Sequence, residues 1–139
     1  DMYIIRSGIL NTVLTTEQYD EIKRGELNPQ DIQMHDTIRE FVTKNNEVVE
    51  YLPFKISYKD TDRNGKDKYI FNEETKEFQP SYFYSPVIYA YGKELRILLE
   101  LGVHAPVKIV YQEQWNDGNL YRTLVCVQDQ RTGLIDDCQ

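Results

Sequence analysis

The sequence predicts an α+β domain in which a mainly antiparallel sheet of hairpins carries about three helices. A chain of 139 residues has the length of one domain. Helical and hairpin patterns follow one another in blocks rather than in βαβ alternation, which favours an antiparallel sheet. Two dipeptides, Asn64-Gly65 and Asp117-Gly118, are typical of tight hairpin turns. We therefore expect one α+β domain over residues 2–139, leaving out Asp1, which precedes a methionine.

The first part of the chain predicts a bent strand followed by a short helix. Residues 2–14 are rich in β-forming side chains and are interrupted by Ser7-Gly8, which indicates a bend or bulge in one strand, or else a small hairpin. Thr15 is followed three residues later by a glutamine, a capping-box pattern that starts a helix. Gly25 provides a left-handed stop. A helix over residues 16–24 is expected.

A second helix is predicted from Asn28-Pro29 to about Lys44, with asparagine as N-cap and proline in the first turn. At 100° per residue its apolar side gathers four residues, which are Met34, Ile38, Phe41 and Val42. The opposite side is acidic and includes Asp36 and Glu40. This face is expected to point to solvent.

The middle of the chain reads as a meander of strands. Residues 47–58 have an extended pattern, in which Pro53 marks an edge or a break. The Asn64-Gly65 turn is expected to pair residues 54–59 with residues 67–72. A second turn, at residues 72–76, would return the chain through Phe78.

A third helix is predicted from Ser85-Pro86 to Gly102, and it should be the most buried one. Its apolar stripe consists of Ile88, Tyr91, Leu95 and Leu98, which recur at helical spacing. Residues 107–115 and 120–128 then flank a turn at residues 116–119 and predict a C-terminal hairpin.

One segment resembles part of a calcium loop. Asp60, Asp62, Asn64 and Gly65 stand at the first, third, fifth and sixth positions of such a loop. The twelfth position, which should be a bidentate glutamate, is Phe71. We expect a polar turn here, and no metal or other cofactor in the protein.

Charge and residue content narrow the classes of function. Sixteen basic and 23 acidic residues give a net charge of −7, which argues against a protein that binds the phosphate backbone of nucleic acid. Charged residues interrupt the longest apolar stretch, so no membrane contact is expected. The histidines and serines are not arranged as a nucleophile with a base. The set consists of His35, His104, Ser7, Ser57, Ser81 and Ser85. An enzyme is therefore not favoured, and catalytic residues are not assigned.

The two cysteines fit neither a metal site nor a disulfide scaffold by their spacing. Cys126 lies in an apolar strand pattern and is expected to be a buried, unreactive side chain. Cys138, next to the end of the chain, is expected to be frayed. These features favour a reducing compartment and predict a cytoplasmic protein.

The first functional hypothesis is a non-enzymatic acidic binding protein. Such a domain would present carboxylates where phosphates would lie, as a nucleic-acid mimic that inhibits a basic host-defence partner without contacting nucleic acid itself. The expected partner-binding residues combine carboxylates with two tyrosines between Pro80 and Pro86. They are Asp36, Glu40, Glu73, Glu74, Glu77, Tyr82 and Tyr84.

Two alternatives remain open at the level of sequence. One is a small-molecule or nucleotide-binding domain or enzyme, with an aromatic pocket between the third helix and the C-terminal hairpin. The pocket residues would be Tyr91, His104, Tyr111, Trp115 and Arg122. The other alternative is a structural subunit whose exposed hairpin edges pair between copies.

Overall fold

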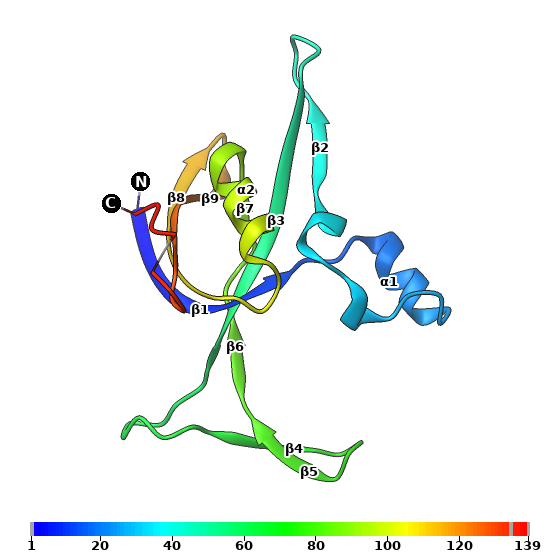
Figure 1. Ribbon diagram of the computed structural model, residues 1–139, viewed down its shortest axis with the longest axis vertical. Helices are drawn as coiled ribbons and strands as arrows, with labels where there is room; N and C mark the ends of the chain where they lie inside the picture. The colour runs from blue at the N-terminus through cyan, green and yellow to red at the C-terminus, as the bar shows by residue number, and fades with distance from the viewer. Residues whose placement is uncertain (1, 134, 139) are drawn as a thin grey trace.

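Five strands close into a barrel in the computed structural model, which describes residues 2–133 and 135–138 (Figure 1). The barrel strands are β1 (Met2–Thr12), β3 (Val48–Lys59), β7 (Ile88–Ala90), β8 (Pro106–Asn116) and β9 (Asn119–Asp129). The remaining elements are α1 (Thr16–Lys23), the 3₁₀ turns η1 (Pro29–Asp31) and η2 (Met34–Thr37), β2 (Arg39–Val42), β4 (Tyr69–Asn72), β5 (Glu77–Pro80), β6 (Tyr82–Tyr84) and α2 (Gly92–Leu101).

The pairing of these strands identifies the architecture. β1 pairs with β8 and with β3, β3 with β7, and β8 with β9, all antiparallel. β7 and β9 run parallel and meet at one pair, Tyr89 with Thr123. Around the barrel the strands follow one another in the order β1, β3, β7, β9 and β8, and β8 then pairs with β1. Along the chain, α2 lies between β7 and β8. This is the arrangement of the OB-fold, a five-stranded Greek-key barrel.

The predicted fold class is therefore wrong. The chain is mostly β, with 49% of its residues in strands, and its described residues contain two α-helices instead of about three packed on an open sheet. The hairpin patterns were present in the sequence, but closure depends on pairs between strands that are distant along the chain.

Gly8 makes the closure possible. β1 changes partner near this residue: Ile9 lies opposite both Pro106 of β8 and Ser57 of β3. A Cβ atom at Gly8 would collide with the backbone carbonyl oxygen of Ser57. The interruption that the sequence predicts at Ser7-Gly8 is thus the position where one strand joins two neighbours.

The core fills the barrel from alternating strand positions and from one helix. Leu52, Phe54 and Ile56 of β3 have no exposed surface. α2 packs against β9 and β3, and its Leu98 is also fully buried. Gly102 ends α2 as predicted. In the part of the chain that the structure describes, no helix has the length and apolar character needed to cross a membrane.

The predicted second helix is absent. Residues 34–37 form the 3₁₀ turn η2, and residues 39–42 form β2, which pairs with the outer part of β3. The residues that follow η2 are rich in β-branched and aromatic side chains, and Asn46, at φ 62°, supplies the turn of a hairpin. Cross-strand pairing with β3 overrides the helical spacing of Phe41 and Val42.

The third helix begins later than predicted. The Ser85 N–H donates to the Ile56 carbonyl, and the Ser85 hydroxyl accepts from the Ile56 N–H, so this residue joins the sheet instead of capping a helix. Ile88 consequently lies in β7, and Tyr91 is the N-cap of α2. The helix predicted at residues 16–24 is confirmed as α1, with the capping box of Thr15.

The Asn64-Gly65 turn does not pair the two segments expected. β3 pairs with β6 and β7, whereas β4 pairs with β5 in a separate two-stranded sheet that projects from the barrel (Figure 1). The turn instead closes a local loop, in which the Asp62 carboxylate accepts hydrogen bonds from the backbone N–H groups of Asn64 and Lys66. The Oδ1 atom of Asp62 therefore stabilises the turn by accepting both hydrogen bonds.

Cys126 is buried in β9 as predicted, but the two cysteines are not separate. Cys126 and Cys138 form a disulfide, with their Cα atoms 5.0 Å apart. A turn after β9 folds the end of the chain back, and the Asp137 N–H donates to the Val127 carbonyl. Cys138 is thereby brought beside Cys126 instead of fraying.

Candidate functional site

The outer surface of β3 is defined by strand alternation. Since Leu52, Phe54 and Ile56 face the core, Tyr51 and Lys55 must face outward. Neighbouring strands place further aromatic side chains on this surface. Phe41 lies beside β3 on β2, and Tyr89 lies opposite Pro53 on β7. The outer face of the barrel therefore carries a row of rings that runs across the strands.

These rings line a cleft. The ring centroid of Tyr51 lies 5.7 Å from that of Phe41, 5.9 Å from that of Tyr89 and 6.3 Å from that of Tyr91. The cleft has a volume of about 270 Å³, and we call it the tyrosine cleft. Its lining residues are Phe41, Tyr51, Tyr89, Tyr91, Leu120 and Tyr121.

The tyrosine cleft lies over the narrowest seam of the barrel. Tyr89 and Thr123 are the one residue pair that joins β7 to β9, and Tyr121 stands two residues before Thr123. The β2–β3 hairpin and the β8–β9 hairpin contribute residues on its two sides. In OB-folds this is the face, between the first and the last connecting loops, on which oligonucleotides and oligosaccharides bind.

Two tyrosines at the edge of the cleft are accessible to solvent. Tyr91 is 37% exposed and Tyr121 is 49% exposed, so the rings are not closed off by the core. Burial, together with the neighbouring tyrosines, raises the pKa of the Tyr91 hydroxyl above its usual value. The hydroxyl stays protonated at neutral pH and can donate or accept a hydrogen bond.

Two basic side chains lie on the same outer face as Tyr51. Arg39 lies directly opposite Tyr51 on β2, and Lys55 stands four residues further along β3. The Arg39 Nη2 donates to the carbonyl oxygens of Val13 and Leu14, each at 3.2 Å, while its buried Nε has no hydrogen-bond partner. Within the described residues, no ion pair involves Arg39 or Lys55.

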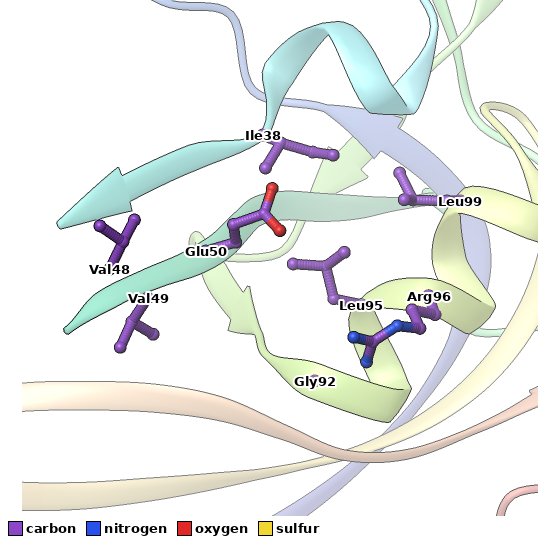
Figure 2. Close-up of a pocket in the computed structure, with 8 residues that line it drawn as sticks. All are labelled: Ile38, Val48, Val49, Glu50, Gly92, Leu95, Arg96 and Leu99. Carbon is purple, nitrogen blue, oxygen red and sulfur yellow. The ribbon is translucent and has the colours of Figure 1, made fainter.

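A second cavity lies on the other side of the same hairpin. It has a volume of about 420 Å³ and is enclosed by the β2–β3 hairpin and α2 (Figure 2). Its walls are aliphatic, with Leu95 and Ile38 facing each other and Glu50 and Arg96 as charged groups. It contains no aromatic ring, and it adds nothing to the row of rings on the outer face.

The residues of the predicted aromatic pocket are dispersed. Tyr91 lies in the tyrosine cleft, whereas Tyr111 is 3% exposed and belongs to the core. Trp115 is 71% exposed near the β8–β9 turn. Arg122 is paired with Glu113 on β8 at 2.8 Å, and His104 lies in the connection from α2 to β8.

The predicted partner-binding residues lie on separate parts of the molecule. Asp36 accepts a hydrogen bond from the Gln33 N–H in η2, and Glu40 lies on β2. Glu73, Glu74 and Glu77 belong to the projecting β4–β5 sheet and its turn, and Tyr82 and Tyr84 lie on β6 with 47% and 60% of their surface exposed. The structure does not bring these carboxylates together on one face.

Sequence reasoning missed four of the aromatic residues of the cleft: Phe41, Tyr51, Tyr89 and Tyr121. The available signal was the alternation around Tyr51, where residues 52, 54 and 56 are apolar. It leaves position 51 on the opposite face. Which other strands lie beside that face was not readable from the sequence.

No family model matches the chain, and no curated protein matches its sequence. Several solved structures, including the following two, are similar in shape. A small single-stranded DNA-binding protein from Streptomyces coelicolor aligns over 94% of this chain and 93% of its own, with 10% identity and a TM-score of 0.40. A Plasmodium falciparum SSB in complex with single-stranded DNA aligns over 88% and 81%, with 11% identity and a TM-score of 0.32.

These findings correct the predicted function. Both titles name proteins that engage single-stranded DNA directly, whereas the sequence favoured an inhibitor and nucleic-acid mimic with a basic protein partner and no nucleic-acid contact. That prediction is wrong. Likenesses at 10% and 11% identity and TM-scores of 0.40 and 0.32 establish no shared function, so the cleft of this chain has to supply the evidence.

Proposed function

We propose that this protein binds single-stranded nucleic acid by stacking unpaired bases on the rings of the tyrosine cleft. The observation that carries the proposal is the row of rings around Tyr51 on the outer face of an OB-fold barrel. Every base has a flat π-surface, so tyrosine and phenylalanine rings accept bases with little preference for sequence. Exposed rings at this position are therefore suited to a single strand.

The aromatic lining of the cleft suits single strands better than duplexes. The cleft has a volume of about 270 Å³ and is partly open to solvent. The faces of bases in a duplex are covered by stacking on their neighbours, and only unpaired bases can be splayed out onto aromatic side chains. The tyrosine hydroxyls at the rim can then bond to base edges or sugars.

Alanine substitution of Tyr51 or Tyr89 tests the proposal. Each lost stacking surface should weaken binding of an oligothymidylate by about 1 to 3 kcal/mol, or roughly 5- to 150-fold. Binding is measured by titration calorimetry and by quenching of intrinsic fluorescence. Tyr19→Ala on α1 is the matched control, because this tyrosine is 55% exposed and lies outside the cleft.

The control variant should bind as the unmodified protein does. Equal losses in Tyr19→Ala and Tyr51→Ala, or no binding of a single strand by the unmodified protein, would refute the proposal. A duplex of the same sequence should bind more weakly than its separate strands.

The cytoplasmic location expected from the sequence stays a prediction. The disulfide between Cys126 and Cys138 is of a kind that persists in oxidising compartments and is rare in the cytosol of most organisms.

A further inference from the structure

We infer that the tyrosine cleft recognises its ligand through the bases and hardly through the backbone, so that it accepts unpaired nucleobases on a flexible backbone whether that backbone is charged or neutral. The inference rests on the proposed function. It concerns which part of the strand supplies the affinity, and the distribution of charge on the barrel carries it.

Nearly half of the basic side chains are neutralised by carboxylates. Within the described part of the chain, seven of the sixteen basic residues are held in ion pairs, and these are Arg24, Lys59, Lys68, Lys76, Lys93, Arg122 and Arg131. None of the six residues that line the tyrosine cleft is charged. A strand in the cleft therefore meets rings and hydroxyls first.

Two cations share the outer face of the β2–β3 pair with Tyr51. Arg39 lies directly opposite Tyr51, so both side chains leave the same face of the sheet. Its Nη2 is fixed by the Val13 and Leu14 carbonyl oxygens, and in the described ranges 2–133 and 135–138 no carboxylate forms an ion pair with it. Lys55 shares the outer face of β3, about 13 Å along the strand from Tyr51 at the usual rise per residue. We assign one backbone contact to each.

The number of backbone contacts fixes the dependence of binding on salt. For a single strand the slope of log K against log salt is about −0.7 per neutralised phosphate, so two contacts give about −1.4. Raising salt from about 50 to about 200 mM should then weaken binding only about sevenfold. A protein that follows the backbone through many contacts loses several orders of magnitude over the same range.

The experiment compares two ligands with the same bases. Oligothymidylate carries a charged backbone, and a thymine peptide nucleic acid of equal length carries none. At low salt we expect the affinities to agree within about tenfold, and the affinity for the peptide nucleic acid should not change with salt. Tyr51→Ala should weaken both ligands alike, since both stack on the same rings.

Three variants assign the backbone contacts. Arg39→Gln and Lys55→Gln should each flatten the salt slope for oligothymidylate by about 0.7 and leave the peptide nucleic acid unaffected. Lys76→Gln is the control, because this lysine lies beyond the cleft in the turn of the β4–β5 sheet, paired with Glu73 at 3.4 Å. Arg39→Lys keeps the positive charge and should keep the salt slope of the unmodified protein. If Arg39→Gln lowers the melting temperature, this second variant still tests whether the charge at position 39 sets the slope.

The outcomes separate the two proposals. A slope steeper than about −4, or loss of all binding to the peptide nucleic acid while oligothymidylate still binds, would overturn the inference and leave the proposed function standing. A slope that neither Arg39→Gln nor Lys55→Gln changes would also overturn it. Failure of both ligands to bind would overturn the proposed function itself.

Discussion

Tyr51 shows how much depends on the side of a strand that a residue occupies. Its neighbour Leu52 has no exposed surface and lies in the core, while Tyr51 meets three other rings outside it. A shift of β3 by one residue would exchange these roles and destroy both core and cleft. The tyrosine content of the sequence suggested contact surfaces, but the sequence favoured Tyr82 and Tyr84 because prolines flank them.

Pro53 illustrates a residue that the sequence presents as a break and the structure accommodates within a strand. Ile56 directs both its N–H and its carbonyl toward Ser85, so backbone groups three residues earlier face the opposite edge of β3. On that edge the pairing of β3 with β2 stops at Tyr51, opposite the first residue of β2, and its pairing with β1 starts at Phe54, opposite the last residue of β1. The missing N–H of Pro53 falls in the gap between them.

Glu94 is expected to make the protein less stable as pH rises. Burial and a hydrogen bond with Asp137 raise the pKa of the Glu94 carboxyl, and Asp137 also holds Lys93 at 2.7 Å. Because the pKa of Glu94 is higher in the folded protein than in the unfolded chain, folding favours the protonated carboxyl. The contribution of this group to stability is complete below the ordinary pKa of a glutamate and is lost as pH rises through the pKa of the folded state.

Glu94→Gln should therefore raise the melting temperature at pH 8 and flatten its decline above pH 5. Thermal unfolding followed by circular dichroism over this range checks the expectation. Glu100→Gln on the same helix is the control, because Glu100 is exposed. A steeper decline in Glu94→Gln than in the unmodified protein would contradict it.

At the scale of elements, local signals sufficed where a segment is stabilised by its own residues. The capping box of Thr15 sets the start of α1, and the turn at residues 116–119 joins β8 to β9 as expected. Local signals failed for residues 39–42, where helical spacing was satisfied but pairing with β3 decided the structure. They failed again before α2, because Ser85 bonds to Ile56, a residue 29 positions away.

The C-terminal segment should depend on its disulfide. Reduction, or the double substitution Cys126→Ser and Cys138→Ser, should lower the free energy of unfolding by about 2 to 4 kcal/mol, because the bond closes a short loop in the unfolded chain. Urea denaturation with and without a thiol reductant measures the loss. The double variant should not respond to the reductant, whereas an equal response in both proteins would contradict a role for this bond.

At the scale of the whole molecule, net charge was a poor guide to the site. The value of −7 describes the entire surface, but Arg39 and Lys55 lie on the same outer face as Tyr51, and neither forms an ion pair within the described residues. Barrel closure was equally hidden in the sequence. It depends on β1 changing partner and on a single parallel pair between β7 and β9, and neither leaves a local pattern.

Closure of the barrel should be sensitive to Gly8. A methyl group at this position would collide with the Ser57 carbonyl, so β1 and β3 must separate to admit it. Gly8→Ala should cost about 1 to 3 kcal/mol of stability, as overpacking does in a tightly packed interior. Chemical denaturation measures the cost, with Ser7→Ala as the control because Ser7 is exposed. Equal stability of the two variants would show that β1 does not approach β3 this closely.

The single pair between Tyr89 and Thr123 also links recognition to folding. With so few hydrogen bonds across this seam, β7 and β9 are held together mostly by the side chains on either side of it. A single strand of nucleic acid whose bases stack on Tyr89 and Tyr121 would bridge β7 and β9 from the outside and hold the two strands together. The free energy of binding would then add to the free energy of unfolding, so the protein should become more stable as the cleft fills with ligand.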